Sequence, residues 1–347
     1  MKLLTGKKIL IFFLFYLCSV TCNKSHKKLK PAFRCKPDET KPIPIPETNI
    51  LPYPKNIKNK RNLDADGFKD FNIYLDLENF NNETQFYEID PDVKQIYIQG
   101  MQKAVNTLKS LLKVKPLANN YVLSDEDIKR FQIYLWNQSN IGTAMSNQGK
   151  GILETGIDLF IFVRFDSLEE STLATAGARF MDTSSGHPII GIANINKDID
   201  YTKTNSLEYF SATILHEFIH ILGFSNHFFT TYYHNNITKV ENGIKRVYLN
   251  SPKLLQIAKK YFNCEEIDGI ELEDYGGDGT VGSHWEERIL LGDIMNGVVY
   301  PEEQVISEFT LAVLEDSGYY KANYYTGGLM QYGKNKGCEF LYEKCII

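Results

Sequence analysis

The stretch Ser206–Phe224, SLEYFSATILHEFIHILGF, decides the fold of this chain. Apolar residues recur around most of its helical wheel, which predicts a buried helix with Ser206 as its N-cap and Gly223 as its stop. Within that helix stand His216 and His220. Residues four apart lie on one helix face, about one turn from each other, so both imidazoles can reach a single metal ion.

The position of Glu217 indicates the chemistry that a metal ion held by the two histidines would support. A helix turns by roughly 100° per residue, so Glu217 can address a metal-bound water from beside the metal. Two histidines and a glutamate buried without partners would cost on the order of several kcal/mol, so an unliganded polar core is the weaker interpretation. A structural zinc site is closed by four protein ligands, whereas two histidines, a third ligand and a non-ligating carboxylate leave room for water. The pattern therefore predicts a catalytic site with one Zn²⁺ per chain.

The third ligand is open on spacing alone. Extended motifs of this kind have a glycine three residues after the second histidine and a third histidine three residues beyond the glycine. Gly223 is present, but the next expected position is Asn226, and His227 comes one residue late. The other candidate, His284, stands far downstream in the segment GSHWEER. Short spacing favours His227, yet closing a longer loop adds only about (3/2)RT ln n.

The balance of basic and acidic residues along the 347-residue chain changes near Arg61. The first 61 residues carry 14 Lys and Arg against 3 Asp and Glu, whereas the remainder carries 24 against 40. The body therefore has a net charge of −16 and repels phosphate groups. This argues against nucleic acid as its partner.

The N-terminus has the features of a secretory signal peptide, because lysines precede an apolar run at residues 9–20. This run is shorter than the roughly 18–20 residues of a membrane-spanning helix, although an N-terminal anchor is the alternative. We expect residues 1–22 to be removed and the protein to be secreted, extracellular or at the cell surface. No transmembrane span is expected after that removal.

Residues 23–61 are rich in Lys and Pro and too poor in apolar residues to form a domain. We expect a basic pro-segment that is cut near Arg61, with an uncleaved flexible arm as the alternative. The folded body follows. Its composition and periodicity predict strands at residues 71–77, 157–165 and 188–195 and a long amphipathic helix at 93–112. Four cysteines remain after signal removal, and their three possible pairings stay open: Cys35, Cys264, Cys338 and Cys345.

Four segments together resemble the leishmanolysin peptidases, a branch of the metzincins: HEFIHILGF, GSHWEER, the turn GDIMNG and LAVLEDSGYY. The resemblance extends from about Phe71 to Cys345. A lone methionine in a turn is otherwise most often core packing. The resemblance implies the following roles: His216, His220 and His284 as zinc ligands, Glu217 as the catalytic carboxylate, Met295 as the Met-turn residue and His227 as a bystander.

The implied fold is α+β, of the metzincin type. An N-terminal catalytic subdomain, residues 62–225, would hold a mixed sheet and two long helices, one of them the zinc helix. A more irregular C-terminal subdomain, residues 226–347, would hold the third histidine, the Met-turn and a helix at 307–316, with a cleft between the two. The implied function is a secreted zinc endopeptidase acting on proteins or peptides. The alternative is a non-catalytic surface or adhesion protein that keeps the scaffold.

The two ends of the chain depart from the family pattern. Family pro-segments carry a cysteine that occupies the open position of the zinc, and Cys35 is the candidate here, although no histidine follows it. Its neighbours Arg34 and Lys36 should lower the pKa of the thiol, which suits a zinc ligand. A plain disulfide of Cys35 is the alternative. No apolar tail follows Cys345, so a GPI anchor signal is not visible.

Overall fold

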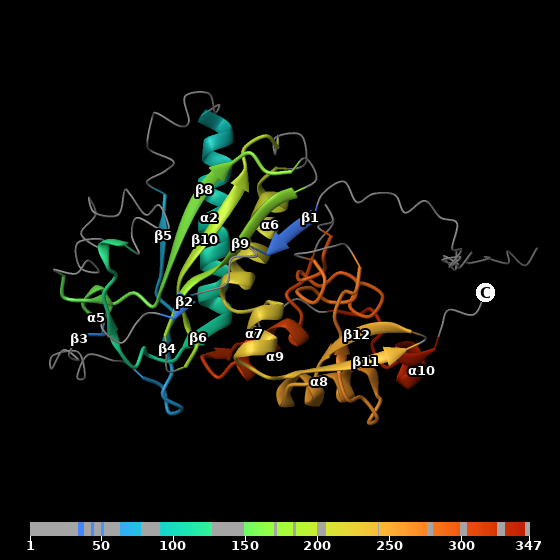
Figure 1. Ribbon diagram of the computed structural model, residues 1–347. Coiled ribbons are helices and arrows are strands. Elements are labelled where there is room, and N and C mark those ends of the chain that lie inside the picture. Colours follow the sequence, from blue (N-terminus) through green and yellow to red (C-terminus); the bar gives the residue numbers. More distant parts are fainter. Residues whose placement is uncertain are drawn as a thin grey trace, which may run out of the picture.

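The computed structural model describes the body of the chain and three short strands of the N-terminal segment. The described body comprises residues 63–77, 91–126, 149–169, 172–182, 185–199, 206–241, 243–275, 280–298, 304–324 and 330–343. The three strands, of which only the backbone is described, are β1 (Arg34–Pro37), β2 (Ile43–Pro44) and β3 (Ile50–Leu51). Figure 1 shows a sheet covered by two long helices, with the C-terminal elements gathered beside its lower end.

The main sheet has the strand order β1-β9-β10-β8-β5, with β2 also paired to β9. Its body strands are β5 (Ile73–Asp76), β8 (Leu159–Asp166), β9 (Thr172–Met181) and β10 (Pro188–Asn196). The pair β9–β10 is antiparallel, whereas β10–β8, β8–β5, β1–β9 and β2–β9 are parallel. The sheet is therefore mixed, as predicted.

Strand β8 is apolar almost throughout because both faces of the sheet are covered. Its residues Leu159, Ile161 and Val163 pack with the helices, whereas Phe160 and Phe162 belong to a second cluster on the opposite face. Continuous apolar runs are typical of strands that are buried on both sides. The predicted strands at 157–165 and 188–195 are confirmed as β8 and β10, and the first predicted strand shortens to β5.

Two long helices cover one face of the sheet (Figure 1). They are α2 (Pro91–Leu111) and α6 (Ser206–Ile221), which pack against each other, and α6 also contacts β9 and β10. Both helices are confirmed within two or three residues of their predicted bounds. Ser206 is the first helical residue rather than the residue before the helix. Gly223 adopts a φ of 112°, which a residue with a side chain rarely takes, and the helix ends just before it.

The C-terminal part holds more regular structure than the sequence predicted. The expected helix at 307–316 is present as α9 (Glu308–Asp316), and Ser307 caps it by accepting hydrogen bonds from the backbone N–H groups of Phe309 and Thr310. The other elements of this part were not predicted, because their apolar residues occur in short, broken runs without a clear period. They are α7 (Asn226–Thr231), β11 (Asn236–Glu241), β12 (Ile244–Leu249), α8 (Pro252–Phe262), β13 (Ile270–Glu271) and α10 (Gly337–Tyr342).

A strand pairing and a disulfide connect segments that lie far apart in the sequence. Strand β14 (Tyr320–Ala322) returns to the N-terminal part and pairs with β6 (Leu112–Val114), which also pairs with β4 (Lys69–Asp70). A disulfide joins Cys264, after α8, to Cys338 in α10. Cys345 lies outside the described residues. The last elements are β7 (Asn120–Tyr121), which pairs with β3, and α5 (Ile152–Thr155).

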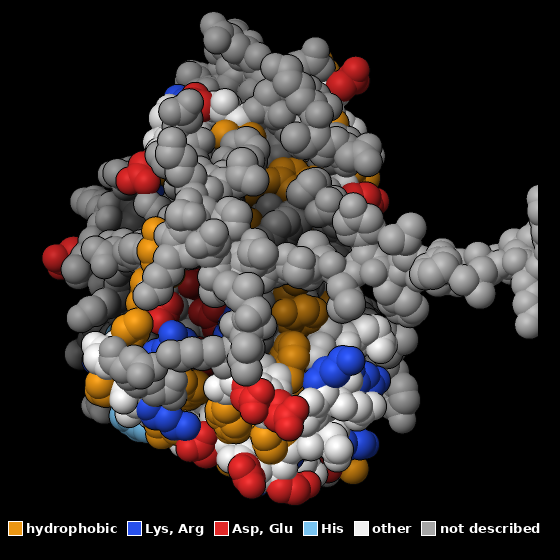
Figure 2. Space-filling model, turned by 90° about the vertical axis from the view of Figure 1, so that its right-hand side faces the viewer, with side chains coloured by type: hydrophobic (Ala, Val, Ile, Leu, Met, Phe, Trp, Pro, Cys, Tyr) orange, Lys and Arg blue, Asp and Glu red, His pale blue; other side chains and the backbone are white. Residues whose placement is uncertain are grey.

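Figure 2 shows how the charged side chains of the described residues are distributed on one face of the molecule. Among the described residues there, Asp and Glu side chains lie beside Lys and Arg over the lower part of the molecule. None of the helices in the described ranges combines the length and the apolar character that crossing a bilayer requires. The apolar run at residues 9–20 lies outside those ranges.

Helix α6 packs so closely on the sheet that position 191 in β10 has room only for a glycine. A Cβ at Gly191 would lie 2.3 Å from Cγ2 and 2.8 Å from Cδ1 of Ile221. We expect Gly191→Ala to lower the free energy of unfolding by about 1–3 kcal/mol, as overpacking of a core does. Chemical denaturation of the variant and the wild type measures this difference.

The matched control is Ile221→Ala, alone and combined with Gly191→Ala. Since the smaller side chain removes the clash, the double variant should be more stable than the sum of the two single effects predicts. Strictly additive losses would contradict this close approach.

Candidate metal centre

Two of the three histidines come from the buried helix α6. His216 is 0% exposed and His220 is 1% exposed. The helix packs against α2 and against the sheet, so the face that carries both imidazoles is fixed by packing on several sides. The distance between their Nε2 atoms is 3.0 Å.

The third histidine, His284, comes from an irregular segment far along the chain. This segment lies beside β13, since Leu272 and Trp285 form a bridge and the N–H of Glu273 donates to the carbonyl of His284 at 2.9 Å. The His284 Nε2 atom lies 3.1 Å from that of His216 and 3.2 Å from that of His220. Among the described residues, these three histidines form one of two groups with metal-ligand spacing.

The other candidate, His227, lies apart from this group. It belongs to α7, and its Nδ1 atom is 3.5 Å from Oγ1 of Thr231. The structure therefore brings together His216, His220 and His284, and it leaves His227 elsewhere. The role of His216, His220 and His284 as metal ligands stays a prediction.

Backbone carbonyls determine which nitrogen of each histidine carries the proton. Nδ1 lies 2.5 Å from the Ile294 oxygen in His216, 2.6 Å from the Phe224 oxygen in His220 and 3.0 Å from the Thr280 oxygen in His284. A carbonyl oxygen only accepts, so each Nδ1 must be the donor. A neutral imidazole has a single N–H, and all three Nε2 atoms are therefore bare lone pairs.

These three lone pairs face one another at 3.0–3.2 Å, with no proton to share. Such an arrangement is repulsive unless a cation lies among them. In a tetrahedral zinc site with Zn–N distances of about 2.0–2.1 Å, two nitrogens lie roughly 3.3 Å apart. The observed triangle is close to that size, so the residues present fit a zinc ion.

Burial keeps the three rings neutral, as metal ligation requires. Burial and the neighbouring His284 lower the pKa of His216 to about 3. Burial, followed by both other histidines, lowers the pKa of His220 well below its usual value of 6.5. Burial also lowers the pKa of His284 to about 4.

Two further predicted residues lie close to the histidines. Glu217 is 0% exposed and follows His216 directly on α6. Met295 is also 0% exposed, and its carbonyl accepts a hydrogen bond from the N–H of Trp285 at 3.0 Å. The residue before it, Ile294, supplies the carbonyl on His216. The Met295 turn is thus in contact with the candidate site through the backbone.

Cys35 is described only by its backbone, in β1. This strand pairs with β9, with Arg34 opposite Thr172 and Lys36 opposite Thr175. Strand β9 and β1 itself contact α6. The backbone of Cys35 therefore runs along the edge of the sheet that supports the helix with the two histidines. The thiol lies outside what the structure describes.

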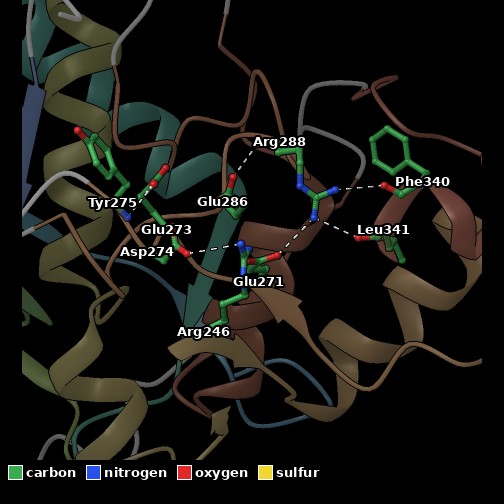
Figure 3. Close-up of polar contacts among 9 residues, drawn as sticks. All are labelled: Arg246, Glu271, Glu273, Asp274, Tyr275, Glu286, Arg288, Phe340 and Leu341. Carbon is green, nitrogen blue, oxygen red and sulfur yellow. Dashed lines mark hydrogen bonds and ion pairs between the residues drawn. The ribbon is translucent and has the colours of Figure 1, made fainter. Parts of the chain in front are cut away.

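An acidic cluster next to His284 was not predicted (Figure 3). The carboxylates of Glu273, Asp274 and Glu286 lie within 4.8 Å of one another. Burial, followed by the charges of Glu273 and Glu271, raises the pKa of Glu286 to about 7. One member of the cluster, Glu286, is visible in the segment GSHWEER. The other two, Glu273 and Asp274, come close to it through the bridge between Leu272 and Trp285, which the sequence does not show.

Basic side chains border this cluster. Arg246 and Arg288 both pair with Glu271, and Arg288 also donates to the backbone oxygens of Phe340 and Leu341 in α10 (Figure 3). Exposed acidic groups frequently gather without holding an ion. The cluster therefore places acidic groups beside the histidine site.

Acid should destabilise the metal-free protein through the three buried histidines. The unfolded chain binds protons on them near pH 6.5, whereas the folded chain takes up protons on His216 and His284 only near pH 3 and pH 4, and the pKa of His220 is also lowered well below 6.5. Stability conferred by the neutral rings is therefore present above about pH 6.5 and falls as the pH drops toward 4.

His284→Gln removes one titrating ring, so the variant's loss of stability should be smaller than that of the wild type by about 1.4 kcal/mol per pH unit in this window. Urea denaturation in the presence of a chelator, from pH 7 to 4.5, measures both slopes. Parallel slopes would contradict the neutral, buried state of His284.

Comparison with known proteins gives one consistent result. The sequence profile of the leishmanolysin family, peptidase family M8, matches residues 94–347. A leishmanolysin homolog of Crithidia fasciculata is 38% identical over 169 residues, 47% of this chain and 25% of the relative. A leishmanolysin-like peptidase of Drosophila melanogaster is 30% identical over 215 residues, 50% of this chain and 31% of the relative. Leishmanolysin of Leishmania tropica is 31% identical over 193 residues, 54% of this chain and 28% of the relative.

The chain matches about a quarter to a third of the length of each of these relatives. The family match covers most of the body, including α6, His284 and Met295. The resemblance that the motifs indicated is thereby confirmed. This chain belongs to the leishmanolysin family.

Proposed function

We propose that this protein is a secreted zinc-dependent endopeptidase that hydrolyses peptide bonds of proteins or peptides. One observation carries the proposal: three buried histidines direct bare Nε2 atoms toward one another, and Glu217 follows the first of them on the same helix. A structural zinc site would be closed by a fourth protein ligand. Three nitrogens leave one position for water, which is the arrangement of catalytic zinc sites.

In this proposal, Glu217 is the group that moves the proton. When bound, zinc lowers the pKa of a water to about 7 and polarises the carbonyl of the peptide bond. Glu217 takes the proton of the attacking water and gives it to the amine that leaves when the C–N bond breaks. The histidines hold their orientation throughout, because their Nδ1–H groups stay bonded to the carbonyls of Ile294, Phe224 and Thr280.

The same proposal extends to the organisation of the body. Residues 62–225 would form the N-terminal and residues 226–347 the C-terminal catalytic subdomain of a metzincin, with the substrate cleft between them. Met295 would be the Met-turn residue. In support, two histidines belong to the first part and the third belongs to the second, so a bound zinc ion would join the two.

We also propose that residues 1–22 are a signal peptide and that residues 23–61 are a removable pro-segment. The pairing of β1 with β9 supports the second assignment, because it lays the segment along the sheet that carries α6. The thiol of Cys35 would then occupy the open position of the zinc until the segment is cut off. Secretion places the mature protein outside the cell or at its surface.

Glu217→Gln should abolish catalysis without releasing zinc. Loss of the proton carrier should lower kcat/KM for casein by about 10²–10⁴-fold. His284→Ala should lose zinc as well as activity, whereas the matched variant His227→Ala should keep both. Elemental analysis and casein cleavage of the purified proteins, after removal of residues 23–61, measure the two properties. A wild type that binds zinc but still cleaves no protein after residues 23–61 have been removed would favour the alternative, a non-catalytic surface or adhesion protein.

Cys35→Ser should remove latency in the full chain. We expect this variant to cleave casein at once, whereas the wild type gains activity only as residues 23–61 are lost. Lys36→Ala is the control, because it changes the same strand and keeps the thiol. Activity time courses with N-terminal sequencing test the idea. Equal initial activity of the Cys35→Ser variant and the wild type would speak for a plain disulfide or a passive arm.

A further inference from the structure

A buried carboxylate lies between the Met295 turn and helix α9. Asp293 is 0% exposed, and its two oxygens accept hydrogen bonds from three groups. The N–H of Met295 donates at 2.6 Å, the N–H of Ser307 at 3.2 Å and the hydroxyl of Thr310 at 2.9 and 3.0 Å. A buried carboxylate is tolerated when such donors replace its water, and its position is then fixed by all of them.

One path leads from Asp293 to His284. The Oγ1 atom of Thr310 donates to Asp293 and accepts a hydrogen bond from the indole Nε1–H of Trp285 at 2.9 Å. Trp285 and Thr310 are both 0% exposed. Because Trp285 directly follows His284, fixing the indole also restrains the backbone from which the third imidazole projects.

A second path leads from Asp293 to His216. Asp293 bonds to the backbone of Met295, two residues on, and so closes a tight turn around Ile294. The N–H of Ile294 is held by the carbonyl of Val305 at 2.8 Å, and its own carbonyl accepts the Nδ1–H of His216 at 2.5 Å. The turn thus presents one carbonyl in a fixed direction, and that carbonyl sets the tautomer and the orientation of His216.

We propose that Asp293 is a positioning residue of the metal centre, acting on His284 through Thr310 and Trp285 and on His216 through the carbonyl of Ile294. This inference rests on the proposed zinc site and adds to it a residue that does not touch the metal. It also explains why a carboxylate, rather than an apolar side chain, lies in the core here. Groups that orient metal ligands typically change metal affinity by about 10–100-fold when they are removed.

Thr310 offers the sharpest pair of variants, because its hydroxyl alone among the atoms of this residue joins Asp293 to the indole of Trp285. Thr310→Val keeps the shape and removes the hydroxyl, whereas Thr310→Ser keeps the hydroxyl and removes a methyl group. We expect zinc affinity, measured by competition with a chromogenic chelator, to fall by about 10–100-fold in Thr310→Val. It should stay within about threefold of the wild type in Thr310→Ser. Asp293→Asn, which removes the charge and one acceptor, should weaken zinc binding at least as much as Thr310→Val.

Two further measurements separate positioning from a general loss of stability. Tyr121→Phe removes a buried hydroxyl that donates to Asp182 at 2.6 Å, in the apolar cluster on the other side of the sheet. This control should lower the melting temperature and leave zinc affinity unchanged. The visible absorption bands of the Co²⁺-substituted protein should shift in Thr310→Val and Asp293→Asn but not in Tyr121→Phe.

The inference is overturned if Thr310→Val and Asp293→Asn lose stability as Tyr121→Phe does while their zinc affinity and Co²⁺ spectra match the wild type. It is equally overturned if the wild type binds no zinc, since nothing would then be positioned. A wild type that binds zinc but cleaves no protein after residues 23–61 have been removed contradicts the proposed peptidase alone. In that case the expected differences in affinity and spectra would still support the role of Asp293.

Discussion

The arrangement on which the site depends is a set of three N–H···O=C hydrogen bonds, each from the Nδ1 of a buried histidine to a backbone carbonyl. These bonds commit the only proton of each neutral ring to the side away from its neighbours. The three Nε2 atoms are then left as lone pairs within 3.2 Å of one another. A core would not hold such a group for its own stability, because no hydrogen-bond donor among the described residues satisfies these lone pairs. The surrounding fold therefore makes sense as a frame for a cation.

Different parts of that frame hold His220 and His284 in position. Helix α6 is pressed against the sheet at Gly191, where a methyl group would clash with Ile221, the residue next to His220. The turn that ends at Gly223 brings the carbonyl of Phe224 back onto His220 itself. His284 depends instead on a non-regular segment, which is held by the bridge of Trp285 to Leu272, the residue after β13, and by the hydrogen bond of the Trp285 indole to Thr310. The site thus combines one rigid helix with one segment that needs polar anchoring.

The sequence predicted the parts of this structure that leave long, continuous patterns. The apolar runs of β8, β10, α2 and α6 are of this kind, and the spacing of His216 and His220 on a helix follows from elementary geometry. The spacing alone could not choose between His227 and His284, because a long loop costs little more to close than a short one. Recognition of GSHWEER and the GDIMNG turn as leishmanolysin-like segments supplied that choice.

Other features left no trace in the pattern of residue types. Every residue has a carbonyl, so nothing in the sequence marks those of Ile294, Phe224 and Thr280 as acceptors. The pairing of Cys264 with Cys338 depends on α8 and α10 lying side by side, and the acidic cluster depends on the bridge between Leu272 and Trp285. The sequence predicted a pro-segment or a flexible arm at residues 23–61, and the pairing of β1 with β9 could not be predicted because it depends on a sheet edge that forms only in the fold.

The most direct test of this account is X-ray absorption at the zinc edge of the purified full chain, together with its zinc content. One zinc per chain with three imidazole nitrogens at about 2.0–2.1 Å and one further ligand is the predicted result. That ligand would be oxygen at a similar distance or, with Cys35 in place, sulfur at about 2.3 Å. A chain without stoichiometric zinc, or a zinc ion held by four imidazoles or by two, would contradict the account.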